Sequence, residues 1–283
     1  MNQYKYREIS SPSNQEVKNL LRLVNERVHG GEGRKVFLVE GPHLVEVALA
    51  SQCVILKRVF MSSAFLEKLK EKAGKIITEL EAGRVDIVLA SERVIKKLSN
   101  TLTPQGIIGV AEIMLSGLAE VCIKGEAFIV VADAVQDPGN MGSLIRTADA
   151  AGADALVVLP GSCDPYMPKA LRAAAGSLFN IPVVQADYGT FVHWSTEKNI
   201  RIIGADSSAE KNIYKTSLSG PLCLVFGNEG QGLSRPVRKV LAEAVAVPIP
   251  GRAESLNVTA AAAVCIFEVI RQRQEKQGVY LTQ

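Results

Sequence analysis

Apolar runs that alternate with segments of helical periodicity constrain the fold of the second part of the chain most strongly. Each run is apolar throughout rather than at every second position, which is typical of parallel strands covered on both faces of a sheet. Strands of this kind are expected at residues 127–133, 155–160, 181–185, 200–205, 222–227 and 244–249, with helices near 140–151, 167–176, 189–197, 234–242 and 257–273. The sequence therefore predicts an α/β layered domain with a parallel sheet.

A similar series precedes this one. Ser13 and Glu16 form a capping-box pattern, and apolar residues at helical spacing follow, which predicts an amphipathic helix that ends at Gly30. Strands are expected at residues 36–40, 54–60, 86–90 and 106–113, with helices from residue 42 and around 64–74 and 91–99. The alternation again predicts an α/β unit.

The length of 283 residues exceeds the usual size of one domain. A less regular stretch near 114–126 separates the two series, and we expect domains at 1–118 and 119–283. The net charge is only +3, but the excess of Lys and Arg lies in the first domain. Because that domain carries no catalytic grouping, we interpret it as a recognition domain. Its basic excess favours contact with a polyanion, and chance variation on a solvated surface is the alternative.

Composition argues against several classes of protein. No apolar stretch reaches the roughly 20 residues needed to cross a bilayer, and the start, MNQYKYREIS, lacks the apolar segment of a signal peptide. The five cysteines lie far apart and form no CxxC or Cys/His cluster, which argues against a disulfide framework or a zinc site. We expect a cytoplasmic protein with no membrane contact and no metal.

Three loops that follow expected strands carry unusual residues, and ligands in open parallel sheets bind at such strand ends. The first loop leads into 137-DPGNMGSLIRTADAAG-152. Asn140 stands where it can cap the next helix, which is its simplest role. Arg146 follows almost two helical turns later, so we expect it to project from the same side; a plain surface arginine is the alternative.

The second loop, 226-FGNEGQGLS-234, has glycines at 227, 230 and 232 that allow a tight turn and a close approach to a ligand. Glu229 lies inside this turn. The spacing G-x-x-G-x-G is neither the dinucleotide-binding fingerprint nor a phosphate-binding loop. A flexible loop with no binding role is the alternative interpretation.

The third loop runs through 245-VAVPIPGRAESLNVTAAAAV-264. Pro248 and Pro250 stiffen the exit from the strand, whereas Ser255 and Asn257 offer hydrogen-bonding groups at the start of a helix. Leu256 between them offers an apolar contact. Such a loop suits a flat heterocycle held by backbone hydrogen bonds, although helix capping and packing would explain each feature separately.

Together the loops resemble the three signature motifs of the SpoU (TrmH) family of RNA 2′-O-ribose methyltransferases, in the SPOUT superfamily. The motifs are D-P-x-N-x-G-x-x-x-R-T-A, G-x-E-x-x-G and P-x-x-G-x-x-E-S-L-N-V, in the family's order and spacing. Upstream, 38-LVEGPHLVEVAL-49 and 103-TPQGIIGV-110 are similar to the family's N-terminal substrate-binding domain. The resemblance covers most of the chain.

The resemblance implies a C-terminal parallel-sheet SPOUT-type domain with a deep trefoil knot, preceded by a smaller α/β RNA-recognition domain, in a homodimer whose active site lies at the subunit interface. It also implies S-adenosylmethionine as the methyl donor, with no metal. The cofactor-binding positions of the family correspond to Gly227, Val247, Ile249 and Leu256. Val247 stands where isoleucine is common, which is a conservative difference.

The implied reaction is an in-line displacement in which a ribose 2′-hydroxyl attacks the sulfonium methyl group. The catalytic positions of the family correspond to Arg146, Asn140, Glu229, Ser255 and Asn257. Arg146 matches the family's proposed general base, but a guanidinium titrates above about 12, so electrostatic stabilisation of the developing alkoxide is the alternative role. The other four residues would position Arg146 and the ribose or shape the cofactor loop.

Ribosomal RNA is the expected substrate, because the separate N-terminal domain resembles that of members that modify ribosomal RNA. A transfer RNA methyltransferase and a non-catalytic RNA-binding relative of the same fold are the alternatives. An oxidoreductase that uses the glycine loop is disfavoured by the missing dinucleotide fingerprint.

Overall fold

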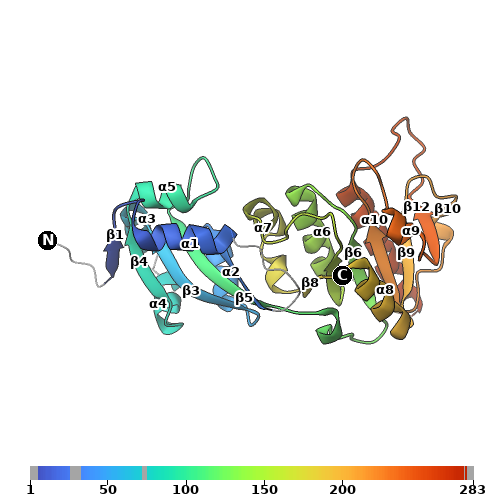
Figure 1. The fold of residues 1–283 in the computed structure, drawn as a ribbon, viewed down its shortest axis with the longest axis horizontal. Helices are drawn as coiled ribbons and strands as arrows, with labels where there is room; N and C mark the ends of the chain where they lie inside the picture. Colours follow the sequence, from blue (N-terminus) through green and yellow to red (C-terminus); the bar gives the residue numbers. More distant parts are fainter. Residues whose placement is uncertain (1–5, 26–32, 72–74, 277, 279–283) are drawn as a thin grey trace. The chain divides into compact units, whose positions relative to one another are not determined.

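The computed structural model describes residues 6–25, 33–71, 75–276 and 278. Contacts between residues divide the chain into two compact units, Met1–Leu115 (unit 1) and Ser116–Gln283 (unit 2). Figure 1 shows the helices and strands of each unit. The division expected from the sequence, 1–118 and 119–283, differs from this one by a few residues.

Unit 1 is built on a mixed sheet with the strand order β1-β4-β3-β5-β2. β5 runs antiparallel to β2 and β3, whereas β4 is parallel to both of its neighbours. The strands are β1 (Arg7–Ile9), β2 (Gly33–Glu40), β3 (Val54–Met61), β4 (Asp86–Ala90) and β5 (Ile107–Leu115). The helices are α1 (Gln15–Asn25), α2 (Pro42–Ala50), α3 (Ser63–Glu71), α4 (Lys75–Ala82) and α5 (Glu92–Leu98).

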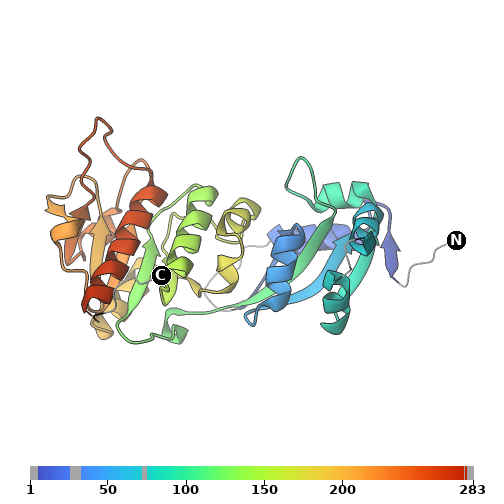
Figure 2. The ribbon, with the colours of Figure 1, turned by 180° about the vertical axis from the view of Figure 1, so that it is seen from behind.

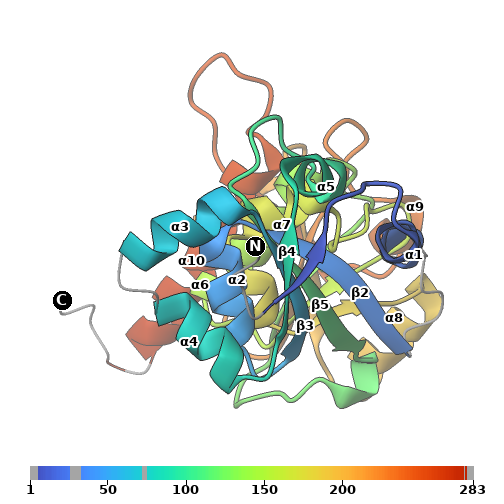
Figure 3. The ribbon, with the colours of Figure 1, turned by 90° about the vertical axis from the view of Figure 1, so that its left-hand side faces the viewer.

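Helices lie on both faces of the unit 1 sheet (Figure 3). α1 and α5 cover one face through a core that includes Val17, Leu20, Leu38 and Ile95. α2 packs against β2, β3 and β5 on the other face. Neither α4 nor the short strand β1 was predicted from the sequence.

The first helix begins differently from the sequence prediction. Asn14, not Ser13, caps α1, because the side-chain oxygen of Asn14 accepts a hydrogen bond from the backbone N–H of Glu16 at 2.8 Å. The predicted capping box is wrong because the Glu16 carboxylate binds Arg7 instead of reaching back to the cap. The predicted end of this helix at Gly30 lies outside the described residues.

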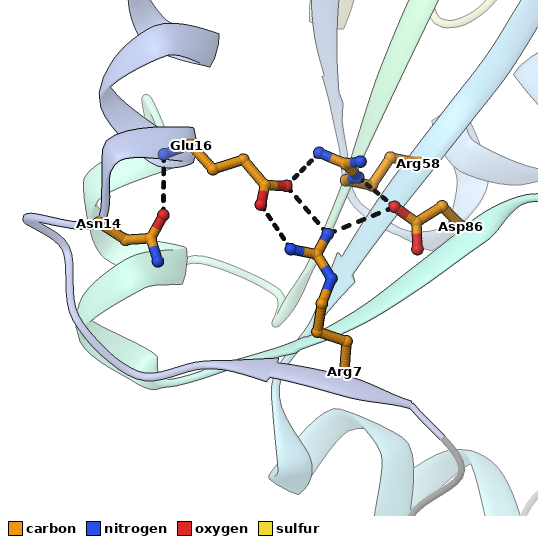
Figure 4. A network of polar contacts seen from close by, with 5 residues as sticks. All are labelled: Arg7, Asn14, Glu16, Arg58 and Asp86. Carbon is orange, nitrogen blue, oxygen red and sulfur yellow. Dashed lines mark hydrogen bonds and ion pairs between the residues drawn. The ribbon is translucent and has the colours of Figure 1, made fainter.

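A network of charged side chains fixes the first strand and the first helix to the sheet. Glu16 accepts hydrogen bonds from Arg7 and Arg58, and Asp86 accepts from both arginines (Figure 4). The hydrogen bond from Arg7 is the main reason that the pKa of Glu16 lies below its usual value. The network therefore joins β1, α1, β3 and β4.

Unit 2 contains a seven-stranded sheet with the order β10-β12-β9-β11-β6-β7-β8. Every neighbouring pair is parallel, which confirms the prediction from the continuous apolar runs. The strands are β6 (Phe128–Ala132), β7 (Ala155–Val158), β8 (Val183–Gln185), β9 (Arg201–Ala205), β10 (Lys211–Asn212), β11 (Leu222–Phe226) and β12 (Glu243–Ala246). The helices are α6 (Pro138–Ala150), α7 (Pro168–Ala174), α8 (Tyr188–Glu197), α9 (Arg235–Arg238) and α10 (Val258–Lys276), with short 3-10 turns η1 (Leu118–Glu120), η2 (Ser177–Phe179) and η3 (Ile213–Lys215).

The order of the chain reverses in the middle of this sheet. From β6 the chain passes through β7 to β8 at one edge and then continues with β9 on the other side, while β11 returns between β6 and β9. Open α/β sheets bind ligands at such a reversal, outside the carboxyl ends of the strands. The three loops singled out in the sequence follow β6, β11 and β12, so they all leave the sheet at its carboxyl edge.

Helices cover both faces of the unit 2 sheet. α8 and α9 pack on one face through a core that includes Phe191, Trp194 and Val237. α6 and α10 lie side by side on the other face (Figure 2). β12 ends at Ala246 rather than at residue 249, because the prolines that follow have no N–H to donate to a strand ladder.

α6 and α7 approach each other closely at Gly142. A Cβ atom at this position would lie 2.3 Å from the carbonyl oxygen of Ala170 and 2.6 Å from Cβ of Ala173. Only a glycine fits such a contact with another backbone. The distance between α6 and α7 is therefore set by this residue.

Two expectations from the composition concern cysteines and membrane helices. All five cysteines are free thiols, and Cys53 and Cys122 are exposed. None of the helices in the described part of the chain combines the length and the apolarity that a membrane span requires.

Candidate active site

The first loop joins β6 to α6. Asp137 caps α6: its Oδ1 accepts a hydrogen bond from the backbone N–H of Asn140 at 2.9 Å, and Pro138 occupies the first helical position. The expectation that Asn140 caps the helix is therefore wrong, since Asn140 lies inside the first turn. Nζ of Lys169 lies 2.5 Å from Oδ2 of Asp137 and is the main reason that the pKa of Asp137 is lowered.

The second loop, between β11 and α9, folds back on itself. The backbones of Asn228 and Gly232 exchange two hydrogen bonds of 2.9 Å. Oδ1 of Asn228 accepts from the backbone N–H groups of Gly230 at 2.9 Å and Gln231 at 3.0 Å. A Cβ atom on Gly227 would lie 2.4 Å from the carbonyl carbon of Gly232. This loop is therefore a closed, hydrogen-bonded turn.

A hydrogen bond between side chains joins the first two loops. Nδ2 of Asn140 donates to Oε1 of Glu229 at 2.9 Å, and the backbone nitrogens of Gln136 and Asp137 lie 3.4 Å from the same carboxylate. Burial alone would raise the pKa of Glu229, but the hydrogen bonds from Asn140 and from backbone N–H groups outweigh burial and lower it. Glu229 is thus an ionised carboxylate that connects the two loops.

Arg146 lies on the exposed side of α6, between buried residues such as Ile145 and Ala148. At 3.6 residues per turn, six residues leave Arg146 about 120° from Asn140 around the helix axis. The two side chains therefore do not project from the same side, contrary to the expectation from their spacing. No group in the described part of the chain forms a hydrogen bond or an ion pair with Arg146.

The third loop connects β12 to α10. Val247 and Ile249 are half-buried, whereas Ser255 and Leu256 are exposed. Asn257 caps α10, because its Oδ1 accepts a hydrogen bond from the backbone N–H of Thr259 at 2.9 Å. Ser255 has no hydrogen-bond partner among the described residues.

The structure therefore brings together some of the predicted site residues and not others. Asn140 and Glu229 are in direct contact, and Arg146 lies on the same helix as Asn140. Within the described residues, no hydrogen bond joins the third loop, with Ser255 and Asn257, to the first two loops. All three loops nevertheless lie at the carboxyl edge of one sheet.

Both units match known protein families. Residues 127–267 match the model of the SpoU rRNA Methylase family, and residues 14–109 match the MRM3-like substrate binding domain. The 23S rRNA (guanosine(2553)-2'-O)-methyltransferase RlmP of Bacillus subtilis is 34% identical over 263 residues, which cover 93% of this chain and 99% of the relative. The chain belongs to the SpoU rRNA methylase family. The family inferred from the three motifs is thereby confirmed.

Solved structures of methyltransferases have the same fold as this SpoU-family chain. The SpoU methyltransferase AviRb from Streptomyces viridochromogenes, in complex with AdoMet, has a TM-score of 0.80 and 27% identity, and covers 92% of this chain and 98% of its own. The AdoMet-bound rRNA methyltransferase from Sinorhizobium meliloti has a TM-score of 0.79 and 27% identity, and covers 95% and 98% respectively. They confirm the SPOUT-type α/β class with a preceding N-terminal domain.

Some residues that position the candidate loops were not singled out from the sequence. Asp137 could have been predicted as the helix cap, because an Asp directly before a Pro is a common start of a helix. Asn228 donates from Nδ2 to the carbonyl of Ala134 at 2.9 Å and so adds a second tie between the loops. The buried Asp133 lies 3.0 Å from the hydroxyl of Tyr188, and no local pattern could reveal a pair so distant in sequence.

Two other observations concern sites beyond the SpoU-family loops. Within the described part of the chain, no three His, Cys, Asp or Glu side chains are grouped so that they could hold a metal ion. An open polar hollow of about 550 Å³ lies between η3 and the end of α10, and its lining includes Tyr214, Lys215 and Arg271. It contains none of the predicted site residues, and Arg271 is already paired with Glu268 and Glu275. We therefore place the candidate site at the three loops.

Proposed function

We propose that this protein transfers a methyl group from S-adenosylmethionine to a ribose 2′-hydroxyl of ribosomal RNA. The observation that carries the proposal is the identity of 34% with the Bacillus subtilis enzyme, which extends over 93% of this chain and 99% of the relative. That relative is named a 23S rRNA 2'-O-methyltransferase. The proposal includes a cytoplasmic location, where ribosomal RNA would be available to the enzyme.

The cofactor would be held by the second and third loops. At Gly227 the backbone of the second loop lies directly against the backbone of Gly232. The half-buried Val247 and Ile249 follow β12 at the same edge of the sheet. Leu256, with 38% of its surface exposed, offers an apolar side chain. Apolar side chains together with exposed backbone groups suit a flat purine and its hydrogen-bonding edge. AdoMet-bound neighbours of the same fold support this choice of cofactor.

S-adenosylmethionine supplies an electrophilic methyl group on a sulfonium, so the protein has to align the ribose and favour loss of its hydroxyl proton. Arg146 presents a guanidinium that no group of its own chain engages among the described residues. We assign it the role of stabilising the developing alkoxide and the neighbouring phosphate. The hydrogen bond between Asn140 and Glu229 fixes the first turn of α6. It therefore also fixes the position of Arg146 further along the same helix.

Ser255 and Asn257 have supporting roles in this proposal. Asn257 fixes the start of α10 through its cap, which defines where the third loop ends. The exposed hydroxyl of Ser255 is available to a ligand. No metal is part of the proposal, because the methyl donor already carries its leaving group.

Three further elements of the proposal concern assembly. Unit 1 binds the RNA, as its match to a substrate binding domain and its basic excess suggest. The chain forms a homodimer, in which the exposed Phe267 of α10 would be covered. The C-terminal domain contains a deep trefoil knot, a part of the proposal that is supported by the similarity in fold to SpoU-family structures.

The decisive experiment measures transfer of labelled methyl groups to ribosomal RNA from cells that lack this protein. Arg146→Ala should lower the rate at least about 100-fold, a typical loss for one electrostatic group at a transition state, with little change in cofactor affinity. Lys198→Ala is the matched control, because this exposed cation precedes β9 at the opposite, amino edge of the sheet.

The outcomes separate the alternatives. Transfer to transfer RNA but not to ribosomal RNA would favour the tRNA alternative, and no transfer to any RNA despite RNA binding would favour a non-catalytic relative. A near-normal rate for Arg146→Ala would contradict its assigned role without affecting the rest of the proposal.

A further inference from the structure

The loop between α5 and β5, residues 99–106, is tied down at its beginning by one carboxylate. Glu40, at the end of β2, accepts hydrogen bonds from the hydroxyls of Ser99 at 2.6 Å and Thr101 at 2.5 Å. The backbone nitrogen of Asn100 lies 3.3 Å from the other oxygen of the same carboxylate. Three consecutive loop residues are thus fixed to the end of the sheet.

The other end of this loop is fixed through backbone contacts. The backbone N–H of Ser62 donates to the carbonyl of Gly106 at 2.8 Å, and the N–H of Gly41 donates to the carbonyl of Ile107 at 3.1 Å. Gly106 has a φ of +83°, and a Cβ atom there would lie 2.8 Å from Oγ of Ser62. Only the middle of the loop is left to project, as it does beyond α5 in Figure 1.

Leu102 occupies the middle of this anchored loop and is 98% exposed. The other exposed large apolar side chains of the described residues are between 38% and 58% exposed, so each of them is partly covered by its own unit. A loop anchored on both sides of a fully exposed leucine presents that side chain in a defined place. Such an arrangement favours contact with a partner over simple disorder of the loop.

The charge next to Leu102 indicates what kind of partner this is. Arg93, Lys96 and Lys97 are exposed residues of α5, the helix that leads directly into the loop. None of the three has an ion pair or a hydrogen bond within the described part of the chain. Their spacing places all of them on the side of the helix opposite the buried residues Val94 and Ile95. Unpaired cations on one side of a helix suit a row of phosphates.

We propose that Leu102 packs against an unstacked base of the RNA substrate while Arg93, Lys96 and Lys97 contact the adjacent phosphates. The inference rests on the proposed function for the identity of the RNA. Duplex RNA buries its base faces, so a single apolar side chain can reach a base only in a loop, a bulge or an end. The loop would therefore select a non-helical region of ribosomal RNA.

Binding to ribosomal RNA by the full chain tests this directly. Leu102→Ala should weaken binding roughly tenfold, as expected for loss of one buried apolar contact, and Leu102→Met should restore most of it. The matched control is Ile55→Ala, an aliphatic residue that is 52% exposed at the other end of β3 from the loop. Thermal stability and cofactor affinity should not change in the two Leu102 variants, because the side chain of Leu102 is almost fully exposed. Ile55→Ala should lower the thermal stability slightly, since half of that side chain is covered by its own unit, and should leave RNA affinity unchanged.

The cations give a second measurement. Lys96→Ala combined with Lys97→Ala should reduce the salt dependence of RNA binding, whereas Leu102→Ala should leave that dependence unchanged. Wild-type affinity for RNA in Leu102→Ala would overturn the inference, as would a loss that Ile55→Ala shares. So would a finding that Leu102→Ala weakens only the binding of a ribosomal protein.

Failure of the inference can be distinguished from failure of the proposed function. If the wild-type protein methylates ribosomal RNA and Leu102→Ala binds it normally, only the role of Leu102 is wrong. If the wild-type protein neither binds nor methylates ribosomal RNA, both are wrong.

Discussion

Gly227→Ala should destabilise unit 2 and disturb the candidate site. The added Cβ atom would lie 2.4 Å from the carbonyl carbon and 2.5 Å from the carbonyl oxygen of Gly232, and 2.5 Å from the backbone nitrogen of Leu233. All three are backbone atoms, so no change of rotamer can relieve the clash. Overpacking of this kind costs roughly 1–3 kcal/mol, and the lower entropy of the unfolded alanine chain offsets only about 0.4–1 kcal/mol of it.

The free energy of unfolding of Gly227→Ala should therefore be lower than that of wild type by on the order of 1–2 kcal/mol. In a domain of this size, that corresponds to a fall in Tm of roughly 2–8 °C. The matched control is Gly230→Ala in the same loop, where the nearest atom to the new Cβ would be Oδ1 of Asn228 at 3.7 Å. This is an ordinary van der Waals contact, so Gly230→Ala should change the free energy of unfolding by less than about 0.5 kcal/mol.

Calorimetric unfolding of both variants measures the stability difference, and titration with S-adenosylmethionine measures the consequence at the site. Opening of the 227–232 turn should displace Glu229 from Asn140 and weaken cofactor binding in Gly227→Ala. Equal Tm values for the two variants would refute the close backbone approach. If Gly227→Ala has the expected lower Tm but an unchanged affinity for S-adenosylmethionine, the turn is not part of the cofactor site.

Two further predictions concern packing and charge. Gly142→Ala should lower the Tm of unit 2, because the clash with the carbonyl of Ala170 outweighs a gain of about 1 kcal/mol in helix propensity. Gly189→Ala, whose Cβ would meet only a side-chain oxygen of Asp187 at 3.2 Å, should leave Tm unchanged or raise it in the same scan. Glu16→Gln should lower the free energy of unfolding by about 1 kcal/mol at neutral pH. The pKa of Glu16 is lower in the folded protein than its ordinary value of 4.5, so the ionised carboxylate stabilises the fold at any pH above 4.5. The difference in free energy of unfolding between wild type and Glu16→Gln should disappear when the pH is lowered below the pKa of Glu16 in the folded protein. A difference that persists at that pH would contradict the role of the charge network.

Much of the fold could be predicted because long apolar runs dominate it. The parallel strands of unit 2 are buried on both faces, which leaves continuous apolar segments in the sequence. The elements that were missed are short or depend on distant partners. β1 has three residues with one buried side chain, and it exists because its backbone pairs with β4 and Arg7 binds Glu16.

Errors at helix starts have a common physical cause. Several polar residues near one helix end can each act as the cap, and the choice depends on what else their side chains can bind. Glu16 binds the two arginines, so Asn14 alone supplies the cap of α1. Asn140 binds Glu229 in another loop, so the cap of α6 falls to Asp137. The local Asp-Pro pair would have favoured Asp137 as the cap of α6. The partners of Glu16 lie far away in the chain, so the cap of α1 cannot be resolved from local sequence.

The contacts of the first two loops support the role that we propose for Arg146. α6 is fixed at its start by the Asp137 cap and by the bond from Asn140 to Glu229, and it is fixed in its middle by the contact of Gly142 with α7. Arg146 lies one turn beyond Gly142 on this helix, and its side chain is exposed to solvent. An internal carboxylate would neutralise that charge before RNA arrives, whereas an unpaired guanidinium keeps its full charge for a phosphate or an alkoxide. Substitutions that loosen α6 should consequently lower the rate of methyl transfer even though they leave Arg146 in place.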